Sequence, residues 1–214
     1  MRTGIWRAWL GMGLLSTLVL VGCGGSGGGD GENDQGIVFR AVSFVKGPAT
    51  IDQEQIRCTE PTVQNAIVDT SWVFDIERNR FFPDPNSGSG NPCGGYIALQ
   101  NNLSTMAMNV QEITVRYEIS GAGIPAPENS ISFGLRINAT SSTDESSSGQ
   151  NNLAYSQLIG QMIPEQMVTW LQQNQNRLPS MPYSMNAFFR AKGQADNGTR
   201  YTSNELSYQF TITR

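Results

Sequence analysis

The chain of 214 residues contains no histidine, and its only lysines are Lys46 and Lys192. The lack of histidine excludes Ser-His-Asp and Cys-His catalytic arrangements and most transition-metal sites. The sequence also lacks GxGxxG, P-loop, GxSxG and CxxCH motifs, the usual signatures of dinucleotide binding, phosphate binding, α/β-hydrolase chemistry and c-type haem attachment. Because the chain is mildly acidic and has only two lysines, we expect no basic patch for nucleic acid or for an anionic membrane surface.

The start of the chain is its most informative segment. Arg2 and Arg7 precede an apolar stretch from Trp9 to Val21, and residues 20–23 are LVGC. The stretch has the layout of a secretory signal and is too short for a stable membrane span. It resembles a bacterial lipoprotein signal with its lipobox. The resemblance implies diacylglycerol transfer to the Cys23 thiol, cleavage before Cys23, and acylation of the new amino terminus, for example with palmitate.

Composition divides the rest of the chain. Residues 24–36 have the sequence GGSGGGDGENDQG, which is typical of a flexible tether spanning roughly 20 Å. We therefore predict a signal peptide at 1–22, a lipidated Cys23 with its tether at 23–36, and one domain at 37–214. Removing residues 1–22 lowers Lys+Arg from 14 to 12 against 18 acidic residues, a net charge of −6. Membrane attachment must then come from the lipid.

The resemblance also bears on the cysteines and on location. With Cys23 lipidated, Cys58 and Cys93 remain, and in an oxidising compartment we expect them to form one disulfide. Closing their 35-residue loop would stabilise the fold by roughly 3–4 kcal/mol. In such lipoproteins a residue other than Asp after the lipidated cysteine permits transfer to the outer membrane. By this resemblance, Gly24 favours the outer membrane over the inner one.

Apolar residues alternate with polar ones along most of the chain, which indicates half-buried strands. We expect strands at 37–45, 67–77, 95–100, 105–110, 113–119, 131–137, 183–191 and 206–212. The last two form a long hairpin, with Asn197-Gly198 supplying turn residues. One segment has helical spacing instead, and Pro164 and Glu165 favour its start, so a short helix is predicted near 164–176.

These elements predict a mainly β fold, a two-sheet antiparallel sandwich of about seven to eight strands. The pattern from Met181 to Ile212 is similar to the last two strands of immunoglobulin-like and fibronectin type III-like domains. The antibody pattern is not matched fully. Trp72 lies between the paired cysteines, but Asn91 stands two positions before Cys93, where a tyrosine would be expected.

Carboxylates are the main candidates for catalysis, because glycoside hydrolysis needs only two. Asp69, Asp75 and Glu77 lie on or beside one predicted strand, where Asp75 and Glu77 share a face about 7 Å apart. The structural interpretation, which we favour, is a solvated outer face opposite Trp72. A Ser-Lys arrangement would need Lys46 or Lys192, and Lys192 is predicted to point outward.

Metal sites are also weighed against simpler interpretations. Residues 84–91 (DPNSGSGN) begin like a calcium loop, but Gly88 and Gly95 occupy ligand positions, so a turn is favoured. Met106 and Met108 could bind Cu(I), but core packing is favoured. The glycosylation sequons at Asn102, Asn138 and Asn197 are interpreted as chance matches. We predict no catalytic, metal or cofactor residues, and lipidation at Cys23.

We expect a lipid-anchored cell-envelope protein whose β-sandwich is a non-catalytic interaction or structural module. Its partners would be the membrane, through the lipid on Cys23, and an envelope protein or glycan, but not nucleic acid. Asn-, Gln- and Ser-rich loops are compatible with binding. The alternative is an envelope enzyme acting on polysaccharide through a carboxylate pair. A substrate-binding lipoprotein is a third hypothesis, which the lack of βα alternation disfavours.

Overall fold

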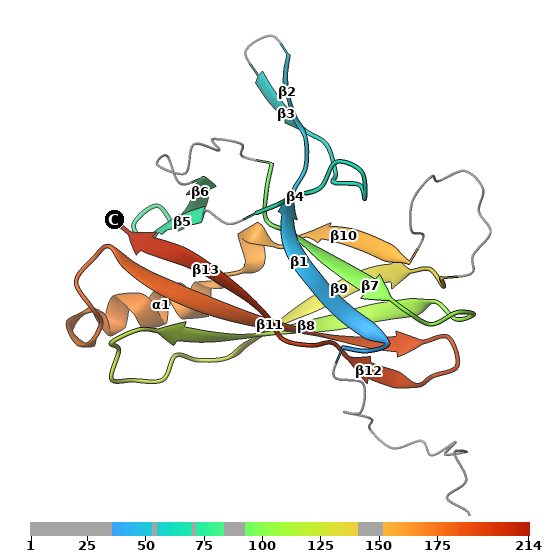
Figure 1. Ribbon diagram of the computed structural model, residues 1–214. Helices are drawn as coiled ribbons and strands as arrows, with labels where there is room; N and C mark the ends of the chain where they lie inside the picture. Colours follow the sequence, from blue (N-terminus) through green and yellow to red (C-terminus); the bar gives the residue numbers. More distant parts are fainter. Residues whose placement is uncertain (1–35, 53–54, 70–71, 84–92, 141–151) are drawn as a thin grey trace, which may run out of the picture.

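The computed structural model describes residues 36–52, 55–69, 72–83, 93–140 and 152–214; the predicted signal and Cys23 lie outside these ranges. The described chain is mainly β structure with one α-helix (Figure 1). Its strands are β1 (Phe39–Lys46), β2 (Ala49–Asp52), β3 (Gln55–Cys58), β4 (Ile67–Val68), β5 (Trp72–Asp75), β6 (Arg80–Pro83), β7 (Tyr96–Asn101), β8 (Met108–Ile119), β9 (Asn129–Ile137), β10 (Leu153–Gln157), β11 (Tyr183–Ala195), β12 (Arg200–Thr202) and β13 (Leu206–Thr213). The helices are α1 (Glu165–Gln173) and two short 3-10 helices, η2 (Ile159–Gln161) and η3 (Gln175–Arg177).

The larger sheet has seven strands in the order β6-β5-β13-β11-β8-β9, with β12 paired to the far end of β11. The alternation along β11 explains its central place. Met185, Ala187 and Phe189 are fully buried, whereas Ser184 and Arg190 are exposed on the other face. Because side chains alternate between the two faces of a strand, one face of this sheet is apolar and the other is polar.

The smaller sheet has four strands in the order β10-β7-β1-β4. β1 pairs antiparallel with β7 from Phe39↔Asn101 to Val45↔Tyr96, with a bulge between Ala41 and Ser43. The central strand β7 is buried along most of its length, as expected for a strand with neighbours on both sides.

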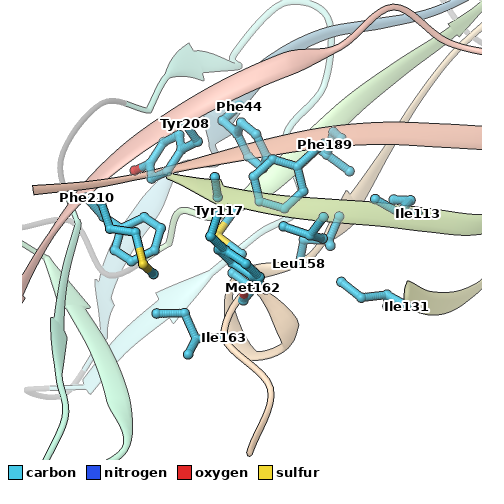
Figure 2. Close-up of a cluster of buried hydrophobic side chains, with 14 of the residues drawn as sticks. Phe44, Ile113, Tyr117, Ile131, Leu158, Met162, Ile163, Phe189, Tyr208 and Phe210 are labelled. Atoms are coloured by element: carbon cyan, nitrogen blue, oxygen red, sulfur yellow. Dashed lines mark hydrogen bonds between the residues drawn. The ribbon is translucent and has the colours of Figure 1, made fainter. Parts of the chain in front are cut away.

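Side chains of the two sheets meet in one hydrophobic core (Figure 2). The Phe44 ring of β1 lies 4.9 Å from that of Phe189 on β11 and 4.8 Å from that of Tyr208 on β13. Leu158 and Met162, beside η2, are fully buried in the same cluster. The helix α1 adds its buried residues Met167, Val168 and Leu171. We call the two sheets without β4, together with α1, the body.

Several predicted elements are confirmed. The helix predicted near 164–176 is α1, which begins after Pro164 and is followed by η3. The strands predicted at 113–119 and 131–137 pair antiparallel within β8 and β9. The C-terminal hairpin forms as β11 with β12 and β13, and Gly198 in its turn has a φ of +88°, which suits glycine.

Other predictions need correction. The described residues form thirteen strands, more than the seven to eight predicted, and β5 runs parallel to β13, so the large sheet is not fully antiparallel. The strand predicted at 67–77 is two strands in different sheets, β4 and β5. Alternation indicates extended backbone but carries no signal for a change of sheet.

The strands predicted at 105–110 and 113–119 are one strand, β8. Gln111 is an extra residue in the pairing of β8 with β11, because the neighbouring residues Lys192 and Gly193 pair with Glu112 and Val110. The buried residues Val110 and Ile113 are therefore three positions apart, and this break in the period of two suggested two strands.

Candidate interaction surface

A two-stranded hairpin projects from the end of β1 (Figure 1). It is formed by β2 and β3, which pair from Ala49↔Cys58 to Asp52↔Gln55; within the described residues they pair with no other strand. We call this hairpin, residues 49–58, the arm. An isolated two-stranded hairpin is marginally stable in water, so the arm depends on the contacts at its base.

The base of the arm is fixed by one covalent bond and close backbone contacts. The sulfur atoms of Cys58 and Cys93 are 2.09 Å apart, which confirms the predicted disulfide. The backbone N–H of Gly47 donates to the carbonyl of Cys93 at 2.8 Å, and that of Thr59 donates to the carbonyl of Pro48 at 3.2 Å. A Cβ on Gly47 would lie 2.1 Å from the Thr59 carbonyl oxygen, so only glycine fits there.

The chain returns to the body through residues 59–68, and we call the arm with this segment the arm pole. Among its described side chains, Val63, Ile67 and Val68 are large, apolar and exposed, with exposed fractions of 44%, 57% and 61%. Ile67 and Val68 form β4, which pairs with the end of β1 and is an edge of the smaller sheet. Exposed apolar residues beside a sheet edge are a common feature of contact surfaces.

The described chain begins at the other end of β1. A Cβ on Gly36 would lie 2.6 Å from the Asn204 side chain. That side chain spans to β1: its Oδ1 accepts from the Ala41 N–H and its Nδ2 donates to the Ala41 carbonyl, both at 3.0 Å. The Nδ2 of Asn102 donates to the Ile37 carbonyl at 2.8 Å. These contacts fix the start of the described chain at the end of β1 that lies opposite the arm pole.

Asp69 lies where the chain leaves β4 for the larger sheet. Its carboxylate is buried and accepts hydrogen bonds from the indole N–H of Trp72 at 2.5 Å and the backbone N–H of Gly95 at 2.8 Å. A Cβ on Gly94 would lie 2.2 Å from the same carboxylate oxygen. Asp69 therefore links β5 of one sheet to the start of β7 in the other.

The prediction that Asp75 lies on a solvated face is wrong. It is only 1% exposed, and its oxygens accept from the backbone N–H groups of Glu77 and Arg78 and from the Arg78 side chain at 2.7–3.0 Å. These bonds, chiefly the one from the Arg78 backbone, hold the pKa of Asp75 below its usual value. The side chain closes the turn after β5, a role that period-two alternation does not predict.

Glu77 is exposed, as predicted, and lies 3.9 Å from the Arg214 side chain. Asp69, Asp75 and Glu77 thus have separate partners, and the structure does not bring them together around one site.

The outer face of the larger sheet carries a network of ion pairs. The Arg116 guanidinium binds Glu118 and Glu205 and lies over the Phe188 ring, 4.2 Å from its centroid. Its hydrogen bond to Glu118 raises the pKa of Arg116. Phe188, an outward aromatic residue that breaks the alternation of β11, is thus covered by a cation.

The network continues along β8 and β11. Lys192 points outward, as predicted, and donates to Glu112 at 3.0 Å. A hydrogen bond from Ser130, and then the one from Lys192, lower the pKa of Glu112. At the far end Arg136 binds both carboxylate oxygens of Asp196 at 2.9 Å. The charges of this face are largely neutralised within the chain.

The other predicted candidates are placed as follows. Met108 is fully buried in the core and Met106 is half-buried. Residues 84–91 lie outside the described residues. Among the described residues no cluster of three His, Cys, Asp or Glu side chains could bind a metal ion. A hollow of about 670 Å³ lies between β5, β6 and the start of α1, lined by Phe81, Phe82 and Ile163 among others.

Comparison of the chain with protein-family models, with curated protein sequences and with solved structures finds no match. The structured ranges of the chain contain no helix of the length and apolar character needed to cross a membrane.

Sequence analysis missed the arm and the junction at Asp69. Gly47-Pro48 and Pro61 bracket the arm and are turn signals. The spacing of Asp69 and Trp72 carries no comparable signal, because Gly95, the second donor, is 26 positions away.

Proposed function

We propose that this protein is a lipid-anchored component of a bacterial cell envelope that presents a non-catalytic β-sandwich as an interaction module. The lipid is carried by Cys23, and Gly24 favours the outer membrane. The observation that carries the proposal is the arrangement of the two ends of β1. The tether joins one end, and the arm pole with its exposed apolar residues lies at the other.

This arrangement determines what would face away from the membrane. The eight residues of β1 span about 26 Å at roughly 3.3 Å per residue, and the tether adds roughly 20 Å. The arm pole would then be the part of the described chain presented farthest from the lipid, where a partner can reach it.

We propose further that the two sheets form an immunoglobulin-like sandwich. The contacts of Phe44 with Phe189 and Tyr208 join the sheets across the core, and β11 with β13 corresponds to the final strand pair of such domains. The parallel β5–β13 pair is a departure from a purely antiparallel arrangement.

The arm pole is the better candidate for partner contact. On the outer face of the larger sheet the charges already have partners, and breaking those pairs to bind another molecule would cost desolvation energy. Ile67 and Val68 expose apolar surface that would be removed from water in a complex.

Attachment is tested with Cys23→Ala. We expect the variant to lose metabolic acyl labelling and to leave the membrane fraction. Unchanged labelling and fractionation would refute the lipid anchor. Replacing Gly24 with Asp in the intact chain tests the location, because the aspartate should retain the protein at the inner membrane.

Partner contact is tested by crosslinking in intact envelopes. The double variant Ile67→Ser with Val68→Ser should lower the yield of crosslinked complexes about tenfold or more, as loss of two buried apolar contacts would. The matched control is Ile37→Ser with Val42→Ser, which removes two exposed apolar residues outside the arm pole. Equal loss in both variants would argue against a specific contact surface.

A further inference from the structure

The disulfide that joins the arm to the body is asymmetric in its exposure. Cys58 is the last residue of β3 and is exposed, whereas Cys93 precedes β7 and is fully buried. An external thiolate can therefore approach the Cys58 sulfur more readily than the Cys93 sulfur. Access of this kind is one of the main determinants of which disulfide sulfur is attacked.

The described contacts between the arm and the rest of the chain lie at the base of the arm, outside the core of the body. Between Phe44 and Trp72, none of residues 45–49 and 57–69, whose burial the structure describes, belongs to the hydrophobic core cluster. Among the described strands the arm pairs only with itself, and the contacts at its base include the disulfide, two backbone hydrogen bonds and one from the Thr59 hydroxyl to the Pro48 carbonyl at 3.4 Å. The disulfide therefore contributes more to the order of the arm than to the packing of the core.

We propose that Cys58–Cys93 is a site of thiol–disulfide exchange, whose opening releases the arm while the body stays folded. The reactant would be a protein dithiol, with two neighbouring cysteine thiols. The significance of the arm for binding rests on the proposed function, but the exchange chemistry does not.

The exchange proceeds in two steps. A thiolate of the dithiol attacks the Cys58 sulfur, forming a mixed disulfide, and Cys93 leaves as a thiolate that takes up a proton. The second thiol then attacks the sulfur of its own mixed disulfide and releases Cys58. The disulfide of this protein gains two electrons and two protons, and the dithiol is oxidised to a disulfide.

The first test uses full-length protein without denaturant and dithiothreitol as the dithiol. Free thiols are counted by alkylation, and hydrogen exchange is followed by mass spectrometry. We expect both cysteines to become alkylated. Hydrogen exchange of the backbone amides in residues 49–52 and 55–58 should accelerate about tenfold or more, while the amides of β8 and β11 stay protected. Thiols that react only after denaturation would overturn the proposal, as would loss of protection in β8 and β11 or an unchanged arm.

The second test determines which sulfur is attacked. The protein is exposed briefly to reduced glutathione that contains no glutathione disulfide. Acid quenching then traps the mixed disulfide for peptide mapping. We expect glutathione on the Cys58 peptide; a predominance on Cys93 would contradict the proposed attack.

The variant Cys58→Ser with Cys93→Ser gives the permanently open form. We expect the amides of its arm to undergo hydrogen exchange as fast as in the reduced protein, and the body to retain a cooperative unfolding transition. If crosslinking fails in the oxidised protein while reduction behaves as expected, the proposed function is wrong and the exchange site stands.

Discussion

Phe189 in the body and Val68 at the arm pole are both apolar strand residues, but their surroundings differ. Phe189 lies on β11, with strands on both sides and the Phe44 ring of the other sheet packed against it. Val68 lies on a two-residue edge strand and is 61% exposed. The body is stabilised by a shared core, and the arm by a covalent bond and backbone contacts at its base.

The difference shows how one chain can combine a rigid scaffold with an accessible segment. Regions with few buried contacts open locally at low free-energy cost, and contact surfaces are often drawn from such regions. In the body, even polar side chains serve the fold, since Asp69 and Asp75 are buried with hydrogen-bond partners.

The largest expected effect is that of Phe189→Ala. It removes a fully buried ring that packs on Phe44, so the free energy of unfolding should fall by about 3–5 kcal/mol. The matched change Val68→Ala at the arm pole should alter it by about 0.5 kcal/mol or less. Chemical denaturation measures both. Similar losses for the two variants would remove the distinction between body and arm pole.

The next largest effect concerns the junction between the sheets. Asp69→Ala leaves the Trp72 indole N–H and the Gly95 N–H without an acceptor, which should destabilise the protein by about 2–3 kcal/mol. Asp69→Asn keeps a side-chain oxygen and should cost less. A denaturation midpoint that is the same for both variants and for the unmodified chain would show that the link between β5 and β7 is unimportant.

At alkaline pH the body should lose stability because of its buried tyrosines. Burial raises the pKa of Tyr183 to about 12, and it also raises the pKa values of Tyr117 and Tyr208. In the unfolded chain these groups ionise near pH 10.0. Their contribution to the free energy of unfolding is therefore complete below that pH and is lost as the pH rises through the folded pKa values.

Ultraviolet absorbance of tyrosinate, followed together with circular dichroism, measures this titration. We expect Tyr117, Tyr183 and Tyr208 to ionise only with unfolding, and Tyr183→Phe to reduce the alkaline loss of stability. Ionisation of all six tyrosines near pH 10 in the folded state would contradict the burial of these three.

The smallest expected effect is that of Asp75→Asn, because the Arg78 side chain that pairs with Asp75 is 66% exposed. The pKa of Asp75 is lower in the folded chain than its value of 3.8 in the unfolded chain. The ionised carboxylate therefore stabilises the fold above pH 3.8, and this stability is lost as the pH falls through the folded pKa. The variant should therefore show a weaker loss of stability in acid. Denaturation at a series of pH values measures it, and an unchanged acid dependence would show that Asp75 contributes nothing through its charge.

The parts of the fold that could be predicted from the sequence follow short-range patterns. The period-two alternation of β11 and β13, the turn at Asn197-Gly198 and the start of α1 at Pro164 are local signals, and each predicted element is present. The disulfide followed from the number of cysteines once Cys23 was assigned to the lipid.

The parts that could not be predicted depend on distant contacts. Three features join segments with no shared local pattern: the bulge at Gln111, the parallel pairing of β5 with β13, and the burial of Asp69 against Gly95. The exposure of Ile67 and Val68 was missed for a related reason, because an apolar pair on a strand normally predicts burial.

The two lysines of the chain allow the most direct test of the central claim, that partners contact the arm pole and not the outer face of the larger sheet. Lys46 lies opposite Ile67 at the base of the arm pole, and Lys192 lies on the outer face. Intact envelopes are treated with an amine-reactive crosslinker, using Lys46→Arg and Lys192→Arg variants to assign the product. The account predicts a crosslinked complex that disappears in Lys46→Arg and persists in Lys192→Arg. A complex that depends on Lys192 and not on Lys46 would contradict it.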